Sequence, residues 1–234
     1  MYAARIHWSD PVCMFIGSPL RQTADVQGFD NGWWGTILGS PRFLKDYGSC
    51  AMVDGVEVCN LTTPQLSAGS SVQSAGISTS TIPYVSNKTV VGCLMAAYIN
   101  NIIGRRWSLV LSAIISLTGV TIEATSAIGS PARYTQFVVG KVIASIAMGM
   151  VVNIVPVYLS ETSPPAARGF AISLYQNVQI IGVIVAAGCV FATSARNDPS
   201  SYLIPMCVQA IAPGIMLLVT PLIPESPRWL VLKG

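Results

Sequence analysis

Charged residues are scarce in this sequence. Asp, Glu, Lys and Arg make up only 10% of its 234 residues, while 52% are hydrophobic. Ordinary soluble domains have roughly a quarter charged residues, which cover their surface. A soluble fold of this length would lack such a surface. The composition therefore favours a membrane protein, with a very apolar soluble domain as the alternative.

Other scarcities exclude further classes of function. The formal net charge is only +3, which is too small to indicate a nucleic-acid partner. The single histidine, His7, lies near the start of the chain. The sequence contains no metal-ligand cluster, phosphate-binding loop or nucleophile triad. We therefore expect neither an enzyme nor a bound metal or cofactor.

Cysteines are also few, and six do not make a disulfide scaffold in a chain of this length. Cys50 and Cys59 differ from the others because they lie in a polar segment, GSCAMVDGVEVCNLT. A disulfide between them fits an external loop, and two free thiols are the alternative. Asn60 follows at once in an Asn-Leu-Thr sequence, which is an acceptor pattern for N-glycosylation.

Long apolar runs are the main positive feature of the sequence. A membrane-spanning helix needs about 20 mainly apolar residues, and four segments meet this requirement. Lipid offers no hydrogen-bond partner to free backbone groups, so these segments should be helical. They cover residues 108–128, 137–159, 170–193 and 202–223.

Two further apolar segments are incomplete. Residues 28–44 are apolar for only part of their length, and residues 1–26 do not supply the missing start. Residues 68–103 resemble two halves of one span, separated at 78–88 by a polar insert whose proline would break a helix. We interpret both defects as gene-model artefacts, namely a wrong first exon and a retained intron.

Charged residues, prolines and glycines recur where the apolar runs end. In chain order these ends read GRR at 104–106, PVYLSE at 156–161, RG at 168–169 and PESPRWL at 224–230. The first apolar segment also begins with GFD at 28–30. Together these patterns resemble the signatures of the sugar porter family of the major facilitator superfamily. The segment that follows Gly28 looks most like fungal lactose and hexose permeases.

The resemblance covers residues 27–234 and implies an all-α membrane protein. It corresponds to the N-terminal six-helix half of a major facilitator fold, with the first two spans defective. The family has twelve spans, and this sequence stops after the sixth. We therefore expect the C-terminal half of the transporter to be missing.

The resemblance also implies a cytoplasmic gate made by acids and bases at the span ends. Opposite charges there would pair between helices and hold that face of the protein shut. Partly exposed ion pairs are individually weak, so several are needed to bias a two-state equilibrium. The alternative is that the bases only anchor helix ends among lipid headgroups. The expected gate residues are Arg105, Arg106, Glu161, Arg168, Glu225 and Arg228.

Asp30 is an acid within an apolar segment, where ionisable residues are costly and usually functional. By resemblance to proton-coupled family members, Asp30 would accept the proton. Lys141 stands where those members have an arginine on the fourth span. Lysine keeps the positive charge but can lose a proton when it is buried. The alternative for Asp30 is a capping or solvated acid at the end of its span.

Two more polar residues lie within the apolar spans. Gln176 matches a glutamine that contacts sugar in this family, and an amide both donates and accepts hydrogen bonds, which suits neighbouring hydroxyl groups. The alternative for Gln176 is a polar contact between helices. Glu123 is a second intramembrane acid, for which the sequence gives no role beyond lining a cavity.

These observations predict a multi-pass carbohydrate transporter of the plasma membrane, which would work as a sugar:proton symporter by alternating access. Its expected partners are a small sugar, a proton and the lipid bilayer. The alternative is a truncated fragment that does not transport, or a membrane sugar sensor.

Overall fold

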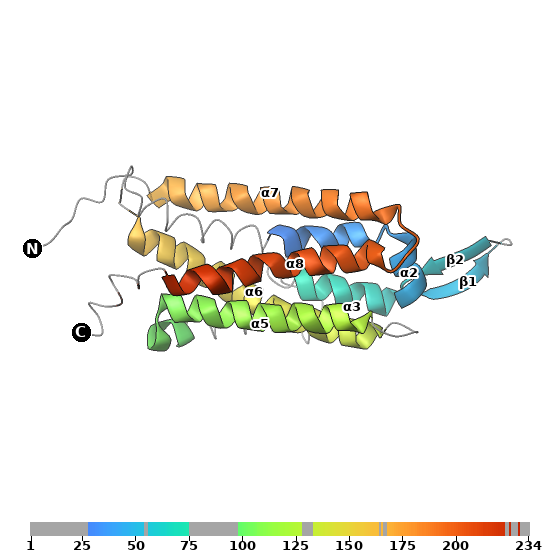
Figure 1. Ribbon diagram of the computed structural model, residues 1–234, viewed down its shortest axis with the longest axis horizontal. Helices are drawn as coiled ribbons and strands as arrows, with labels where there is room; N and C mark the ends of the chain where they lie inside the picture. Colours follow the sequence, from blue (N-terminus) through green and yellow to red (C-terminus); the bar gives the residue numbers. More distant parts are fainter. Residues whose placement is uncertain are drawn as a thin grey trace, which may run out of the picture.

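A computed structural model describes residues 28–53, 56–74, 98–127, 133–163, 165, 168–222, 225 and 229. The expected defects at 1–26 and 78–88, and the gate residue Arg228, lie outside these residues. The described helices lie side by side in one elongated bundle, and a two-stranded hairpin projects from one of its ends (Figure 1).

Four long helices form most of the bundle. They run in alternating directions along it, so that neighbours in sequence are joined at its ends (Figure 1). All four are long and apolar enough to cross a membrane, and each begins a little before the expected apolar segment. They are α5 (Arg105–Ser126), α6 (Tyr134–Thr162), α7 (Arg168–Ser194) and α8 (Ser200–Val219), the last extended by a 3-10 turn at Thr220–Leu222.

The expected first segment, 28–44, is divided in the structure. Residues 28–37 are helical, and a second short helix, α2 (Pro41–Tyr47), follows after a break. The break lies just before Pro41, where Ser40 has an extended backbone. Proline disfavours helical geometry at the residue before it but fits the first position of a helix. Pro41 therefore ends one helix and begins another.

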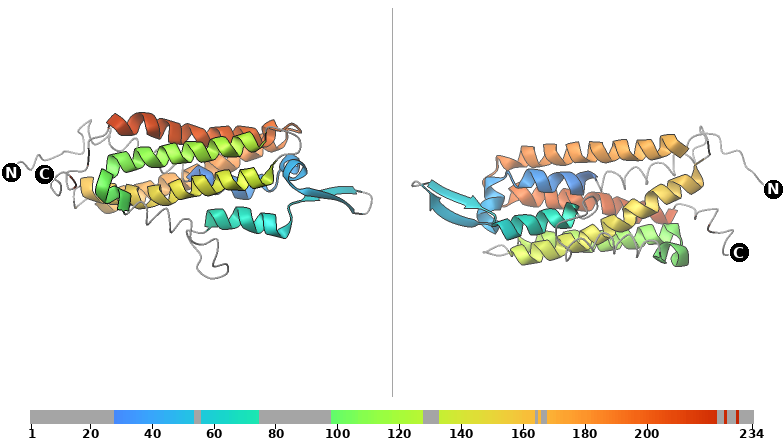
Figure 2. Two further views of the ribbon diagram at one scale, coloured as in Figure 1. Left: turned by 90° about the horizontal axis from the view of Figure 1, so that it is seen from below. Right: turned by 180° about the vertical axis from the view of Figure 1, so that it is seen from behind.

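The hairpin and the helix that follows it lie close to one end of the bundle. Strands β1 (Ser49–Val53) and β2 (Val56–Asn60) pair antiparallel, with Cys50 opposite Cys59. Helix α3 (Thr63–Ser74) follows and packs against α6. Figure 2 shows the hairpin reaching beyond the helices and α3 alongside the bundle. Of the expected second segment, 68–103, residues 75–97 are not described and residues 98–103 are helical.

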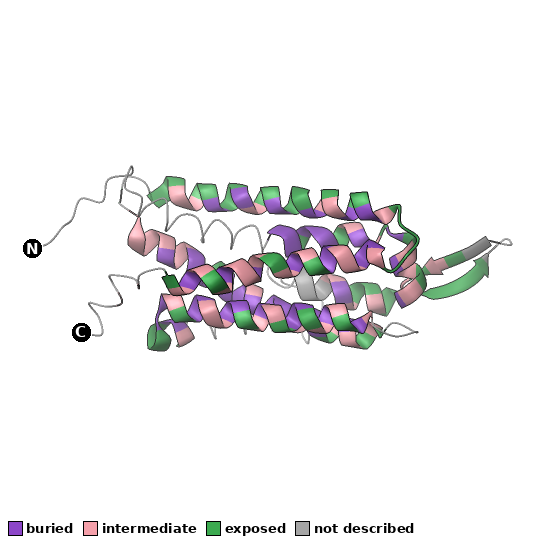
Figure 3. Cartoon of the chain, viewed as in Figure 1, coloured by how far each residue is buried: buried purple, intermediate pink, exposed green. Residues whose placement is uncertain are grey.

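The buried interior has an aromatic part and an aliphatic part. The aromatic side chains gather at the hairpin end and meet mostly edge to face, an arrangement that ring quadrupoles favour. Buried residues line the inner faces of the helices, whereas the outer side of α7 is largely exposed (Figure 3). The aromatic part contains Trp33, Trp34, Phe43, Tyr47, Phe137 and Tyr202.

Helices α5 and α6 approach each other closely where both have glycine. A Cβ atom on Gly119 would lie 2.6 Å from the backbone nitrogen of Ala144, and one on Gly140 would lie 2.7 Å from the nitrogen of Glu123. Small residues of this kind let helix backbones come together within a membrane. The contact fixes which residues of α5 face α6.

Candidate functional site

Asp30 lies in the interior, on the helix at 28–37, and its side chain is only 9% exposed. Its Oδ1 atom accepts hydrogen bonds from Trp33 Nε1 at 3.3 Å and from Gln209 Nε2 on α8 at 2.5 Å. The Lys141 ammonium on α6 lies 3.8 Å from the same oxygen. One carboxylate oxygen thus connects three helices.

Lys141 is 2% exposed, although it carries a charge. Its Nζ atom lies 4.7 Å from the centre of the Trp33 ring and 5.4 Å from that of Trp34. Indole faces attract cations, and the attraction is stronger when the cation is removed from water. The ammonium is therefore held by two ring faces and one carboxylate.

Glu123 on α5 is fully buried and faces the same region. The charges of Lys141 and Asp30 both act on it. Neither of its carboxylate oxygens has a hydrogen-bond partner among the described residues. We call Asp30, Glu123 and Lys141 the buried charge cluster.

Tyr47 links α2 to this part of α5. Its hydroxyl is 2.8 Å from Ser126 Oγ, which donates a hydrogen bond to the backbone carbonyl of Glu123 at 2.6 Å. Burial, together with the negative charges of Asp46 and Glu123, raises the pKa of Tyr47 to about 12, despite the opposing effect of the Ser126 hydrogen bond. The phenol is therefore neutral at physiological pH.

An apolar groove of about 350 Å³ lies beside the buried charge cluster. It is formed by the helix at 28–37, α7 and α8, with Phe29, Val178 and Ile211 among its lining residues. Gln209 also lines the groove, and the same side chain donates to Asp30. Gln209 therefore separates the acid from the groove.

Arg105 and Glu161 form a two-pronged ion pair at the other end of the bundle. Arg105 Nη2 lies 2.9 Å from Glu161 Oε1, and Arg105 Nε lies 3.1 Å from Oε2. The two side chains are only 9% and 5% exposed. A third guanidinium nitrogen donates to the carbonyl of Asn100 at 3.2 Å. This geometry joins the start of α5 to the end of α6, and it is the strong form of an arginine–carboxylate contact.

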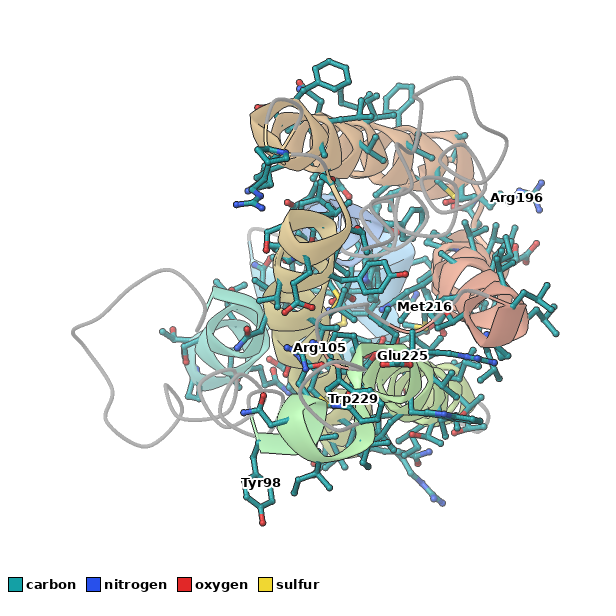
Figure 4. The ribbon with its side chains drawn as sticks, turned by 90° about the vertical axis from the view of Figure 1, so that its left-hand side faces the viewer. Tyr98, Arg105, Arg196, Met216, Glu225 and Trp229 are labelled. Carbon is teal, nitrogen blue, oxygen red and sulfur yellow. A yellow bond between two sulfur atoms is a disulfide. The ribbon has the colours of Figure 1, made fainter. Side chains whose placement is uncertain are left out.

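Glu225 approaches the same end of the bundle, where its hydrogen bond within the described residues is with backbone. Its Oε1 atom accepts from the backbone N–H of Arg106 at 3.2 Å, at the start of α5, while the Arg106 side chain donates to the carbonyl of Pro221. A carboxylate at a helix N-terminus is favoured by the free N–H groups there. Figure 4 shows Arg105, Glu225 and Trp229 gathered at this end.

Gly104 makes room for this carboxylate. Its backbone has φ of +97°, a conformation that side chains disfavour, and a Cβ atom there would collide with the carboxylate of Glu225. The glycine of the GRR motif is therefore required by the geometry of the loop before α5.

The other sequence-predicted residues take no part in the hydrogen bonds and ion pairs described above. Arg168 is exposed at the start of α7 and makes no ion pair with another described residue. Gln176 is exposed on α7. At the hairpin end, Cys50 and Cys59 form a disulfide bond, and Asn60 is exposed at the end of β2.

Sequence reasoning missed Gln209, Trp33 and Trp34. Gln209 could have been noticed because it is a polar residue within an apolar span, where such residues usually have a partner. Trp33 stands three residues after Asp30, a spacing that places both on one face of a helix. The hairpin was also missed, although Asp54-Gly55 between short strands is a strong hairpin signal.

Comparisons with known proteins agree on one family. Residues 23–234 match the family described as "Sugar (and other) transporter". A major facilitator-type transporter, ecdD, of Aspergillus rugulosus is 34% identical over 206 residues, which cover 88% of this chain and 35% of that protein. A quinate permease of Neurospora terricola is 31% identical over 209 residues, covering 88% of this chain and 36% of the permease.

The fold is similar to that of a solved bacterial transporter. A partially occluded, inward-open structure of the xylose transporter XylE from E. coli superposes with a TM-score of 0.71 at 18% identity. The superposition covers 96% of this chain and 51% of the solved one. The chain thus spans about a third of the length of the curated relatives and about half of the solved transporter.

Proposed function

We propose that this chain, which belongs to the sugar (and other) transporter family, supplies the N-terminal half of a proton-coupled transporter for small polyhydroxylated solutes. The substrate would be a sugar, or a hydroxylated acid such as the quinate named for several relatives. The protein would act by alternating access in the plasma membrane.

The observation that carries this proposal is the buried pair of Asp30 and Lys141. Burying an acid and a base inside an apolar bundle costs desolvation free energy, so residues of this kind usually have a function. Asp30 would take up a proton from outside, which weakens its attraction for Lys141. The weaker attraction would then shift the protein from its outward-facing to its inward-facing state, because a change in charge alters the relative energies of these two states.

The gate would lie at the opposite end of the bundle. Arg105 and Glu161 would pair in one state and separate in the other, with Arg106, Arg168, Glu225 and Arg228 acting in the same region. Gln176 would contact the hydroxyl groups of the substrate from α7. Its exposure leaves its amide available to a ligand, which supports this role without identifying the ligand.

The hairpin end would face outward, opposite the gate. Its disulfide is typical of an oxidising compartment, and Asn60 would be glycosylated there. Treatment with an N-glycosidase should increase the gel mobility of the chain made in yeast, and Asn60→Gln should reduce that change, with Asn87→Gln as the control for the other acceptor sequence. A mobility change that is the same size in Asn60→Gln would contradict this assignment.

The central test is uptake of labelled xylose, glucose and quinate by yeast cells that lack their own transporters. The cells would express the chain alone, or the chain joined to the remaining part of a quinate permease. We expect saturable uptake by the joined protein that a protonophore abolishes. A joined protein that reaches the plasma membrane but takes up none of the three solutes would refute the proposal.

Coupling to protons is tested by Asp30→Asn, with Asp46→Asn as the matched control. Asp46 lies on α2, outside the buried charge cluster. We expect Asp30→Asn to lose the dependence on the proton gradient but to keep exchange of solute across the membrane. If the dependence persists in Asp30→Asn, then Asp30 does not couple transport to protons.

A further inference from the structure

The structure buries one more acid than the proposed mechanism uses. Asp30, Glu123 and Lys141 are 6%, 0% and 2% exposed. If all three were ionised, the region would carry a net charge of −1 within the membrane. Burying an ionised carboxylate without a partner is very costly. The second acid therefore needs its own explanation.

Lys141 is not firmly committed to Asp30. The distance of 3.8 Å between Nζ and Oδ1 exceeds that of a hydrogen bond, and Nζ has no hydrogen-bond partner among the described residues. Asp30 already accepts from Trp33 and Gln209 through the same oxygen. The ammonium also lies against two indole faces, so its position does not depend on this one carboxylate alone.

Glu123 lies where it could be that second partner. It faces α6 beside Gly140, the residue before Lys141, and a Cβ atom there would lie 2.8 Å from Glu123 Cγ. Three described groups act electrostatically in this region, Asp30, Lys141 and the Tyr47 hydroxyl. Of these only Lys141 is a base, so its ammonium group is the one described positive charge available to both Asp30 and Glu123.

We propose that Glu123 and Asp30 share a single proton. The proton lies on Glu123 when Lys141 pairs with Asp30, and on Asp30 when Lys141 pairs with Glu123. The transfer breaks the O–H bond of one carboxyl group and forms that of the other, while Lys141 stays protonated. The net charge of the buried charge cluster is zero in both states, so uptake of an outside proton by Asp30 is matched by release of the Glu123 proton to the inside, and transfer of the proton from Asp30 to Glu123 resets the cycle.

This inference deepens the proposed proton coupling and rests on it. It assigns Glu123 as a second proton-binding residue and gives Lys141 a counter-ion in both states. Without Glu123, protonation of Asp30 would leave a bare ammonium group in an apolar interior, which is unfavourable. Lysine suits this exchange because its flexible stem carries a compact charge that can move between partners.

The test is infrared spectroscopy of the purified chain in lipid at neutral pH, which detects the carbonyl stretch of protonated carboxyl groups in an apolar environment. The unsubstituted chain should show this signal. Asp30→Asn and Glu123→Gln should each abolish it, because the remaining acid pairs with Lys141. Lys141→Met should increase it roughly twofold, because both acids are then neutral. Asp46→Asn should leave it unchanged.

Each alternative gives a different pattern. If Glu123 is simply protonated at all times, the signal survives in Asp30→Asn, and the proposal is wrong. If Asp30 alone holds the proton, the signal survives in Glu123→Gln. If both acids are ionised, the unsubstituted chain shows no signal. All of these results are independent of uptake, so they separate failure of this inference from failure of the proposed transport.

A second measurement needs no substitution. Dicyclohexylcarbodiimide modifies protonated carboxyl groups in apolar surroundings, and peptide mass analysis locates the modified residue. The shared proton predicts modification of Glu123 or Asp30 in the unsubstituted chain in lipid. The absence of modification at both residues would overturn the proposal even if the variants fail to fold.

Discussion

The guanidinium group of Arg105 donates to both carboxylate oxygens of Glu161, a residue 56 positions away in the chain. Removing one member of such a buried pair leaves the other charge without compensation. We expect Arg105→Ala to lower the free energy of unfolding by about 3–5 kcal/mol. Arg105→Lys should recover only part of this loss, because an ammonium group lacks the planar two-pronged geometry. Denaturant unfolding in detergent measures both.

The matched control for this pair is Arg168→Ala. Arg168 is exposed and has no ion-pair partner among the described residues. Its removal should change the free energy of unfolding by less than about 0.5 kcal/mol. Equal losses for Arg105→Ala and Arg168→Ala would mean that the ion pair with Glu161 contributes nothing measurable.

Gln209 should contribute to stability through Asp30. Replacing Gln209 with leucine removes the donor from a buried carboxylate, and hydrogen bonds to charged groups contribute about 1.5–3 kcal/mol. Gln176→Leu on the exposed side of α7 is the comparison, and it should cost much less. Thermal unfolding of both variants at neutral pH tests the difference. Indistinguishable midpoints would exclude an energetically important bond to Asp30.

The glycine contact between α5 and α6 predicts opposite effects at two glycines. Gly119→Ala places a methyl group against the backbone of Ala144 and should be destabilising, because the helices must separate. Gly188→Ala on α7 meets nothing within 4 Å and should stabilise the helix by up to about 1 kcal/mol. Unfolding measurements on the two variants would contradict this packing if Gly119→Ala were neutral.

The hairpin disulfide should constrain a short loop. Cys50 and Cys59 are separated by nine positions, and closing a loop of this size contributes about 2–3 kcal/mol in the chain-entropy model. A membrane-impermeant maleimide should label these residues in intact cells only after reduction. Cys50→Ser should expose Cys59 to the reagent without any reductant. Labelling of the unsubstituted hairpin before reduction would show that the thiols are free.

Tyr47 predicts a loss of stability at alkaline pH. Its pKa in the folded protein is about 12, above the ordinary value of 10. The folded state therefore holds the phenolic proton more tightly than the unfolded state. This contribution is complete below pH 10 and is lost as the pH rises from 10 through 12. Tyr47→Phe should show a smaller decline over that range in pH-dependent unfolding, and an identical decline would argue against a buried phenol.

The long helices were predictable because their signal is local. The length and hydropathy of a run decide whether it can cross a membrane, and α5, α6, α7 and α8 all coincide with expected runs. The division of the first segment also has a local cause in Pro41, which lies within the run at 28–44 that was predicted as one segment. The motif resemblance located Asp30, Arg105 and Glu161 and predicted partners of opposite charge for them, without giving the geometry of the contacts.

The contacts themselves depend on the register between helices, which sequence periodicity does not reveal. Glu123 faces α6 beside Gly140 because Gly119 and Gly140 bring α5 and α6 together at one position. A shift of one residue would turn Glu123 away from α6. The contact of Glu225 was not predictable for a related reason: among the described residues, the loop at Gly104 places the backbone N–H group of Arg106 against its carboxylate.

The contact of Glu225 and Pro221 with Arg106 has a mechanical consequence. The chain just after α8 is attached to the first turn of α5 through both the backbone and the side chain of one residue. A tilt of α8 should therefore be transmitted directly to the first turn of α5, where Arg105 pairs with Glu161. Motion at the end of α8 would thus reach the proposed gate without passing through the rest of the bundle.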